Sequence, residues 1–213
     1  MGISDVPRGR PGGPPGVPPG PRGLFFVFEG LDGAGKSTQA RLLVDRLRRL
    51  DGPPPLALKE PSEGPSGRRI RELYGDGGPR DPLAEMELFL ADRAWDVRTN
   101  LEPALAQGRA VVMDRYLLSQ AAYQGALGLQ TPAEILQANA GFPWPDLTFV
   151  MEIAPDEGLA RAAERGLTDP VFEKLDYLVK VKAVYDDFDL PGLLRLDARR
   201  PPAELAAEIG RQA

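Results

Sequence analysis

One glycine-rich run constrains the fold of this chain more than any other part of its sequence. The run matches the pattern G-x-x-x-x-G-K-[ST] and consists of Gly30, Leu31, Asp32, Gly33, Ala34, Gly35, Lys36 and Ser37, followed by Thr38. It stands between a short apolar segment, residues 24–29, and a segment in which Ala40, Leu43, Val44 and Leu47 share one helical face. Glycines let successive backbone N–H groups turn inward, and a following helix adds the positive end of its dipole. The run therefore predicts a phosphate-binding loop between a strand and a helix, in preference to a glycine-rich turn before a capped helix.

Two side chains of this loop are expected to contact a nucleotide and its metal ion. Lys36 supplies a mobile positive charge for the β- and γ-phosphates, and the Ser37 hydroxyl can ligate Mg²⁺. A further group that orients Mg²⁺ or its waters is expected at Asp114, because an apolar strand, residues 110–114, ends there in a carboxylate. The pattern implies a nucleotide such as ATP with Mg²⁺. It leaves the reaction open, because switch GTPases, motor ATPases and small-molecule kinases all use such a loop.

Short apolar runs alternate with longer amphipathic ones along the rest of the chain. Strands are expected at residues 24–29, 55–59, 110–114, 147–153 and 193–196. Asp81 and Pro82 are typical of a helix start, and Pro103 should kink or restart that long helix. This alternation predicts an α/β, P-loop NTPase fold in which a five-stranded parallel sheet is flanked by helices.

The first 23 residues differ in composition from the rest of the chain. They contain seven Pro and seven Gly, so we expect residues 1–23 to form a disordered tail and residues 24–213 a single P-loop domain. The whole chain has a formal charge of −5, no Cys, no His, and no apolar run near the roughly 20 residues that span a bilayer. These features argue against disulfides, nucleic-acid binding and a membrane span, and they favour a cytoplasmic protein whose chemistry uses Lys, Arg, Asp, Glu and Mg²⁺.

Phe89 and Arg93 form a candidate pocket for a nucleobase. They stand four residues apart on a predicted helix, so they share one face and offer an aromatic ring and a guanidinium to the same place. That pair suits a planar base with a carbonyl edge. The alternative is that Phe89 belongs to the core and that Arg93 is solvated or paired with a neighbouring carboxylate.

Several blocks of the sequence resemble the thymidylate kinase family and occur in that family's order. They are residues 25–39, then Glu60-Pro61 with Gly67 and Ile70-Arg71, then residues 89–94, and then Asp114-Arg115-Tyr116 followed by Ser119, Ala122, Tyr123, Gln124 and Gly125. Residues 145–148 resemble the start of the family's fourth strand, so the resemblance spans residues 24–190. It implies transfer of the γ-phosphoryl group of ATP to dTMP by a homodimeric enzyme with a helical lid.

The resemblance also implies roles for single residues. At the base and sugar, Phe89 stacks on thymine, Arg93 bonds a base carbonyl, Gln120 reads the base amide edge, and Tyr123 crowds the sugar's 2′ position. At the phosphates, Arg115 bridges donor and acceptor, and Asp32 lies near the acceptor's 3′-hydroxyl or a Mg²⁺-bound water. Lys59, Glu60 and Arg71 belong to the acceptor site, while Arg161 and Arg165 in the lid meet transition-state charge, as in the bacterial type of the family.

The chain departs from the family pattern in two places. Lys59 stands where members often have Arg, although a lysine cannot bind phosphate through two parallel hydrogen bonds as Arg does, and Asp169-Pro170 stands where a lid Asp-Arg pair is common.

Two other classes of P-loop protein have motifs of their own. A deoxynucleoside kinase would show a Trp soon after Glu-Pro and E-R-S in place of D-R-Y, and a regulatory P-loop GTPase would show N-K-x-D. The sequence has none of these motifs. Those two classes, another nucleoside monophosphate kinase and a homologue without catalysis are the alternatives.

Overall fold

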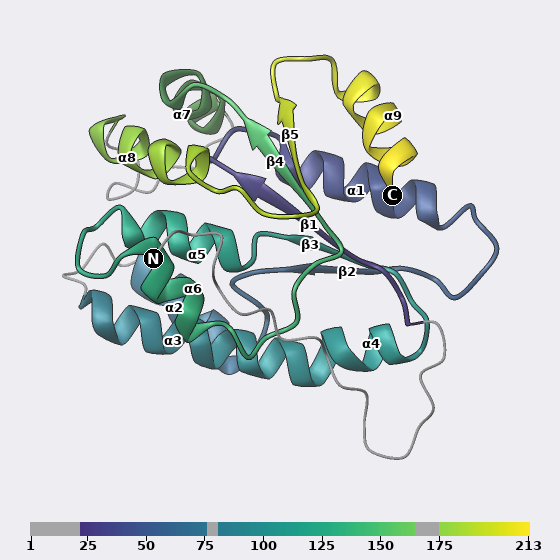
Figure 1. Cartoon of the computed structure of the whole chain (residues 1–213), viewed down its shortest axis with the longest axis horizontal. Helices are drawn as coiled ribbons and strands as arrows, with labels where there is room; N and C mark the ends of the chain where they lie inside the picture. Colours follow the sequence, from purple (N-terminus) through teal and green to yellow (C-terminus); the bar gives the residue numbers. More distant parts are fainter. Residues whose placement is uncertain (1–21, 76–80, 165–174) are drawn as a thin grey trace.

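The computed structural model describes residues 22–75, 81–164 and 175–213. These residues build a parallel sheet with the strand order β2-β3-β1-β4-β5 (Figure 1). The strands are β1 (Phe25–Gly30), β2 (Leu56–Lys59), β3 (Val111–Asp114), β4 (Leu147–Glu152) and β5 (Leu193–Asp197). Each strand end lies within one residue of its predicted position, so the predicted α/β fold is confirmed.

Helices cover both faces of the sheet. In Figure 1, α1 and α9 lie on one side of the sheet, and α3 and α4 lie on the other. The helices are α1 (Lys36–Leu47), α2 (Pro65–Gly75), α3 (Pro82–Asp96), α4 (Glu102–Ala106), α5 (Leu117–Gly125), α6 (Pro132–Ala138), α7 (Pro155–Glu164), α8 (Leu175–Asp186) and α9 (Pro202–Gln212). None of the helices in the described ranges is long and apolar enough to cross a membrane.

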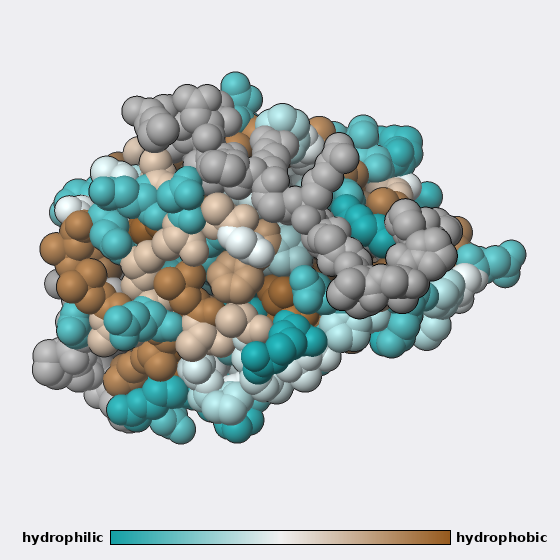
Figure 2. Space-filling model, turned by 60° about the horizontal axis from the view of Figure 1, so that its bottom comes forward, coloured by the Kyte–Doolittle hydropathy of each residue, from teal (hydrophilic) through white to brown (hydrophobic). Residues whose placement is uncertain are grey.

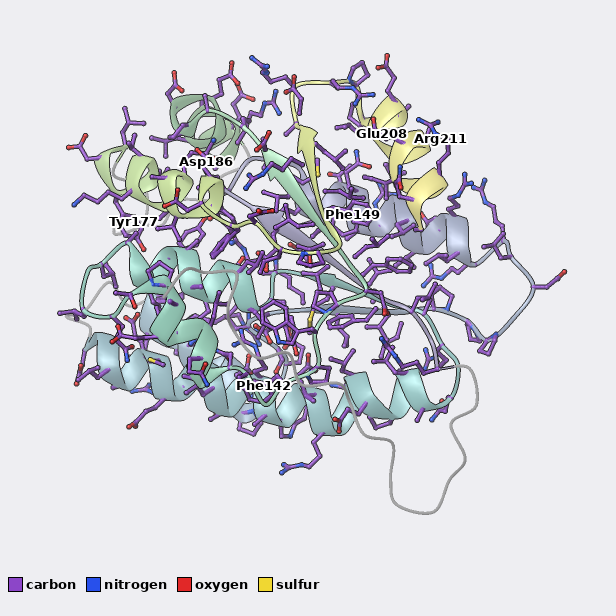
Figure 3. The ribbon with its side chains drawn as sticks, in the orientation of Figure 1. Phe142, Phe149, Tyr177, Asp186, Glu208 and Arg211 are labelled. Carbon is purple, nitrogen blue, oxygen red and sulfur yellow. The ribbon has the colours of Figure 1, made fainter. Side chains whose placement is uncertain are left out.

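The burial of the central strand β1 explains the apolar run at residues 25–28. Every residue of β1 is buried, because β3 and β4 flank it and helices cover both of its faces. The Phe28 ring stacks on Phe149 of β4 with 5.1 Å between centroids, and Figure 3 shows Phe149 within the packed sheet. The register places Phe28 beside Asp114 of β3. The loop after β1 and the carboxylate that ends β3 therefore meet at the same edge of the sheet.

The long helix around α3 follows its sequence signals at both ends. The Asp81 side chain accepts from the Leu83 N–H at 3.0 Å and caps the helix, as predicted. At its other end a π-helical turn, η2 (Val97–Leu101), precedes α4, and the Glu102 N–H donates to the Val97 carbonyl five residues earlier. Pro103 then lies in the first turn of α4. Pro103 thus marks a change of helix type and a restart, because it cannot donate a backbone hydrogen bond.

Two residues at the end of the predicted tail make contacts with the domain. Arg22 Nη2 donates to Asp146 Oδ1 at 2.6 Å, and the Gly23 N–H donates to the Leu105 carbonyl at 2.9 Å. Both residues were expected in the tail, and residues 1–21 lie outside the described residues.

Candidate active site

The glycine-rich run forms a tight loop between β1 and α1. Gly33 and Gly35 have φ angles of 78° and 87°, which glycine adopts without strain. A Cβ atom on Gly33 would lie 2.1 Å from the Gly158 carbonyl oxygen in α7, so a side chain does not fit there. Because α1 begins directly after Gly35, the loop leads into the amino end of a helix. This is the geometry that binds phosphate groups.

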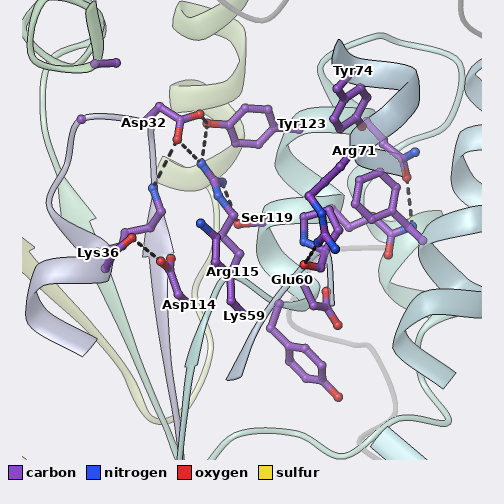
Figure 4. Close-up of a pocket in the computed structure, with 18 of the residues that line it drawn as sticks. Asp32, Lys36, Lys59, Glu60, Arg71, Tyr74, Asp114, Arg115, Ser119 and Tyr123 are labelled. Atoms are coloured by element: carbon purple, nitrogen blue, oxygen red, sulfur yellow. Dashed lines mark hydrogen bonds and ion pairs between the residues drawn. The ribbon is translucent and has the colours of Figure 1, made fainter. Parts of the chain in front are cut away.

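Charged side chains meet over this loop, as the close-up in Figure 4 shows. Arg115 Nη2 donates to Asp32 Oδ1 at 2.6 Å, and Lys36 Nζ lies 3.9 Å from the same oxygen. Lys36 Nζ also donates to the Leu31 carbonyl at 2.7 Å. The Tyr123 hydroxyl donates to the other Asp32 oxygen at 3.3 Å. The fold thus brings together Lys36, which the loop motif had placed at the phosphates, and Asp32, Arg115 and Tyr123, which the resemblance had placed at the phosphates and the sugar.

The electrostatics of this cluster keep Asp32 ionised and weaken the proton affinity of Lys36. Burial opposes ionisation of Asp32, but the charges of Arg115 and Lys36 hold the pKa of its carboxyl well below the usual range. Burial and then the like charge of Arg115 lower the pKa of the Lys36 ammonium to about 8. A polyanionic ligand at this place would restore the proton affinity of Lys36, because an opposite charge favours the charged form.

Arg115 owes its position to an unusual backbone conformation. Its φ angle is 71°, the left-handed region that non-glycine residues rarely adopt, and its N–H donates to the Phe28 carbonyl at 2.9 Å. The guanidinium then lies over the Tyr123 ring, 5.0 Å from its centroid, and Nη1 donates to the Ser119 hydroxyl at 3.2 Å. Backbone strain of this kind collects at functional sites, which agrees with the predicted role of Arg115.

Ser37 and Asp114 lie together as a candidate Mg²⁺ site. The Ser37 hydroxyl donates to Asp114 Oδ2, while Asp114 Oδ1 is buried and has no hydrogen-bond partner in the described part of the chain. A buried oxygen without a partner costs free energy, so a cation or its water would stabilise it. Residues 22–75, 81–164 and 175–213 hold no group of three or more His, Cys, Asp or Glu that could bind a metal alone. The residues fit an Mg²⁺ ion that takes its other oxygen ligands from nucleotide phosphates and water.

A cavity of about 530 Å³ extends from the loop toward α3 and α5. This volume is in the range of small-molecule sites. Most of the predicted site residues line it: Asp32, Gly33, Gly35, Lys36, Ser37, Lys59, Glu60, Arg71, Phe89, Arg93, Asp114, Arg115, Gln120 and Tyr123. Gly30, Leu31, Ala34 and Thr38 belong to the loop and its helix but do not line the cavity. The fold thus collects most of the predicted site residues in one cavity.

Arg93 is fully buried at the far end of the cavity, in contact with several polar side chains. Its Nε donates to Glu60 Oε1 at 2.9 Å, its Nη2 donates to Glu60 Oε2, and its Nη1 donates to Gln120 and Asn139. Burial works against the Glu60 carboxylate and raises its pKa, although Arg93 opposes the rise. For Arg93 the sequence left a base pocket and an ion pair open as alternatives. The structure gives Arg93 an ion pair and a place in the cavity wall, so its contact with a base stays a prediction.

The segment that carries Glu60 is held from α3. Asp92, buried next to Arg93 in sequence, accepts from the Ser62 N–H at 2.7 Å and from the Ser62 hydroxyl. Arg71 of α2 donates to the carbonyls of Pro61 and Ser62, each at 2.8 Å. In the sequence, Asp92 is recognisable only as part of the motif at residues 89–94. Its role as the anchor of this segment depends on a contact between residues thirty positions apart.

Lys59 and Arg71 reach the cavity from exposed positions. Arg71 also pairs with Glu63, with 2.9 Å between Nη2 and the Glu63 carboxylate. Phe89 is half-buried and lines the cavity, and its ring centroid is 6.4 Å from that of Tyr74. These positions agree with the predicted acceptor site.

Glu29 is a buried carboxylate that the sequence did not single out. It accepts from the Tyr116 N–H at 2.9 Å, from the Ser119 hydroxyl, and from the Tyr185 hydroxyl at 3.1 Å. Burial raises the pKa of this carboxyl. Its contacts tie β1 to the first turn of α5 and to α8, so Glu29 supports the segment that carries Arg115.

The predicted lid arginines are less directly connected to the cavity. Arg161 in α7 does not line it, and its Nη1 donates to the Ala198 carbonyl at 3.0 Å. Arg165, Gly166, Asp169 and Pro170 lie outside the described residues. The catalytic roles of Arg161 and Arg165 therefore stay predictions.

Comparison with known proteins identifies the same family as the motifs. The family model described as thymidylate kinase matches residues 28–209. A thymidylate kinase of Desulfotalea psychrophila is 42% identical over 177 residues, which cover 83% of this chain and 87% of that protein. Thymidylate kinases of Xanthomonas campestris pv. campestris and Xanthomonas oryzae pv. oryzae are 41% and 40% identical over 178 residues, 84% of this chain and 77% of theirs. The match extends from β1 to α9 and includes the phosphate loop and the cavity. This chain therefore belongs to the thymidylate kinase family.

Proposed function

We propose that the cavity holds the phosphates of ATP over residues 30–38 and dTMP between Arg115 and Arg93, so that their phosphates meet at Arg115. The chain is a thymidylate kinase, a phosphotransferase that converts dTMP to dTDP. The observation that carries the placement is the Lys36–Asp32–Arg115 cluster, which stands in one cavity between the phosphate loop and the Arg93 pocket. In this arrangement the phosphoryl donor ATP and the acceptor dTMP share one cavity.

The residues around the phosphates supply charge and position. Lys36 neutralises charge on the β- and γ-phosphates. Arg115 exchanges part of its contact with Asp32 for contacts with the phosphates of both substrates. Phosphoryl transfer requires alignment and charge compensation more than a base, because the acceptor oxygen of dTMP is already anionic at neutral pH. The absence of His in the sequence is therefore no obstacle.

Ser37 and Asp114 hold Mg²⁺ in this proposal. When bound, the ion neutralises phosphate charge and keeps the β- and γ-phosphates in one orientation. The buried Asp114 Oδ1 without a partner supports this assignment. Ser37 keeps the Asp114 carboxylate turned toward the loop through its hydroxyl.

The acceptor end recognises the base and the monophosphate. Phe89 stacks on thymine, Arg93 and Gln120 contact its polar edge, and Tyr123 limits the space beside the sugar. Lys59 and Arg71 supply positive charge near the acceptor phosphate. In the described part of the chain one Nη2 N–H of Arg93 has no acceptor, which leaves a donor for a base carbonyl.

A deoxynucleoside kinase is disfavoured by the contacts of Glu60. That reaction needs a carboxylate base near this position to deprotonate a 5′-hydroxyl. Both carboxylate oxygens of Glu60 accept from Arg93 in a fully buried pair. Glu60 therefore serves to position Arg93 and is not available as a base.

We also propose a homodimer that forms through α3. Leu83, Ala84, Ala91 and Ala94 are exposed on α3, and Figure 2 shows apolar atoms gathered on the face that includes this helix. Small apolar side chains on an exposed helix allow a second helix to approach closely, and the opposite face of α3 carries Phe89 and Arg93. Sedimentation should give twice the chain mass for the wild type, whereas Ala91→Glu should give a monomer.

The test of the proposed function is an ADP-release assay with ATP and a panel of acceptors. We expect dTMP to be the preferred acceptor among dTMP, dUMP, dCMP, dGMP, AMP and thymidine, and turnover to stop when EDTA removes Mg²⁺. Faster turnover of thymidine would support a deoxynucleoside kinase. Faster turnover of AMP would support a different monophosphate kinase and refute the placement of thymine.

A further inference from the structure

Gly158 is a buried glycine in α7 that no sequence motif singles out. A glycine inside a helix lowers helix stability relative to alanine, because glycine loses more conformational freedom on folding. Alanine stands at three later positions of the same helix, Ala160, Ala162 and Ala163. The glycine at position 158 is therefore explained by what lies next to the helix and not by the helix itself.

The backbone of Gly158 packs directly against the phosphate loop. A Cβ atom on Gly158 would lie 2.7 Å from the Asp32 carbonyl oxygen, and a Cβ atom on Gly33 would lie 2.1 Å from the Gly158 carbonyl oxygen. Both distances are shorter than a van der Waals contact allows, and both obstacles are backbone atoms, which cannot rotate aside as the end of a side chain can. Glycines on both sides therefore allow α7 and the loop to touch backbone to backbone.

The loop residue at this contact, Asp32, also holds Arg115 over the phosphate site (Figure 4). Arg115 Nη2 donates to Asp32 Oδ1 at 2.6 Å, and the Tyr123 hydroxyl donates to the other carboxylate oxygen at 3.3 Å. The carbonyl that meets Gly158 and the carboxylate that meets Arg115 belong to one residue. A shift of the Asp32 backbone would therefore move the group to which Arg115 is bound.

Further contacts hold α7 in place. Arg161 Nη1 donates at 3.0 Å to the carbonyl of Ala198, which follows β5. Ala162, one helical turn after Gly158, is buried, and Leu159 lines the cavity. Because these contacts fix the helix, a side chain added at Gly158 should displace the loop.

From these contacts we infer that Gly158 is a positioning residue for phosphoryl transfer, because it lets α7 set the place of Asp32 and, through Asp32, of Arg115. Gly158 does not line the cavity, so it acts through the loop and not on a substrate. A displacement of about 1 Å in a catalytic group can lower a rate by roughly 100-fold. The inference rests on the proposed placement of the substrate phosphates at Arg115.

The central experiment measures kcat of Gly158→Ala with ATP and dTMP, together with the melting temperature of the variant. We expect kcat per folded molecule to fall by roughly 10- to 100-fold. The KM values should change by less than about threefold, because the lost alignment matters most in the transition state. A purely structural role predicts the opposite pattern, a lower melting temperature with wild-type kcat per folded molecule.

The matched control is Gly210→Ala in α9, the same change of residue type in another helix. A Cβ atom on Gly210 would lie 2.5 Å from Arg46 Nε, but this obstacle is the end of an exposed side chain that can move aside. Gly210→Ala should therefore keep kcat within about twofold of the wild-type value.

A second variant covers the case in which Gly158→Ala does not fold. The added Cβ atom would also lie 3.3 Å from Ile153 Cγ2. Leucine has nearly the same volume as isoleucine and no methyl branch at Cβ, so Ile153→Leu removes this obstacle and leaves the Asp32 carbonyl in place. Gly158→Ala in the Ile153→Leu background should show the same loss of kcat relative to Ile153→Leu alone.

A double-mutant cycle with Asp32→Ala tests whether Gly158 acts through Asp32. Asp32→Ala removes the carboxylate that holds Arg115, so it should itself lower kcat by roughly tenfold or more. In that background Gly158→Ala should lower kcat by less than about threefold, because both substitutions disturb the same contact.

The inference alone is wrong if Asp32→Ala lowers kcat while Gly158→Ala keeps the wild-type kcat per folded molecule. It is also wrong if the two losses multiply in the double variant, or if Gly210→Ala loses as much activity as Gly158→Ala. Wild-type kcat in Asp32→Ala would instead refute the proposed placement of the phosphates, and the inference with it. The Asp32→Ala measurement therefore separates the two failures.

Discussion

The two ends of the cavity are built in different ways. The proposed donor end is one continuous segment, residues 30–38, with a glycine backbone and the first turn of a helix. The proposed acceptor end is assembled from α3, α5 and the residues that follow β2 and α6, whose side chains meet in a buried network around Arg93. A local motif can therefore specify the first end, while the second depends on the packing of the whole domain.

Because of this difference, we expect substitutions at the two ends to affect turnover and stability differently. Lys36 is a buried cation whose pKa is lowered by burial, so the folded chain gains little from its charge in the absence of phosphate. Arg93 is a buried cation whose partner Glu60 would be left unpaired by its removal. We therefore expect substitutions at the donor end to affect turnover alone, and substitutions at the acceptor end to affect both turnover and stability.

The largest expected effect is that of Lys36→Ala. Loss of a preorganised charge at the transferring phosphoryl group should lower kcat by roughly 100- to 1,000-fold or more. The melting temperature should stay close to that of the wild type, because the substitution removes a charge that is costly to bury. Steady-state kinetics and thermal unfolding measure the two effects. An active Lys36→Ala enzyme would show that phosphate binding depends on the loop backbone alone.

Arg93→Ala should affect the fold and the acceptor together. Removal of one partner of a buried ion pair costs about 3 to 5 kcal/mol of unfolding free energy, and loss of a charge-assisted hydrogen bond should lower kcat/KM for dTMP by roughly tenfold to 150-fold. Denaturant unfolding and acceptor kinetics measure these losses. The control for stability is Arg69→Ala, because Arg69 is an exposed arginine of α2 that does not line the cavity. Equal destabilisation by both substitutions would contradict the importance of the buried pair.

The fold and the donor end were predictable from the sequence because their signals are local. The apolar run before Gly30 and the glycines of the loop are recognisable within about fifteen residues of sequence, and strands buried on both faces are mostly apolar. The meeting of Ser37 and Asp114 follows from the sheet, since the loop that leads to Ser37 begins at the carboxyl end of β1 and Asp114 ends the neighbouring parallel strand β3.

The acceptor end was only partly predictable for the opposite reason. Phe89 and Arg93 were found through their spacing and through family resemblance, but Asn139 and Asp92 have no distinguishing local pattern. Asn139 stands 46 positions from Arg93, and the contact between them depends on how α6 packs against α5. Glu29 was similarly hidden, because a carboxylate at the end of a buried strand indicates nothing about hydrogen bonds from Tyr116 and Ser119.

Phe89→Ala tests whether activity and stability can be separated at the acceptor end. Stacking of a base on an aromatic ring contributes about 1 to 3 kcal/mol, so kcat/KM for dTMP should fall by roughly 5- to 150-fold. Phe89 is only half-buried and belongs to no ion pair, so its loss should destabilise the fold much less than that of Arg93. The KM for ATP should be unchanged. A change in the KM for ATP as large as that for dTMP would show that the two ends are not independent.

The smallest expected effect is a pH dependence that belongs to the donor end alone. Lys36 has a pKa of about 8 in the free enzyme, so it is charged below that pH and progressively neutral above it. Because kcat/KM for ATP reports the free enzyme, it should be flat on the acid side of this pKa and fall about tenfold per pH unit on the alkaline side. The phosphates of bound ATP raise the pKa of Lys36 again, so kcat at saturating ATP should begin to fall only at a higher pH. Lys36→Arg is the matched control, since a guanidinium stays charged throughout this range and should remove the break while lowering the rate. If kcat/KM for ATP showed the same break in Lys36→Arg, another group would be titrating, and the low proton affinity assigned to Lys36 would be wrong.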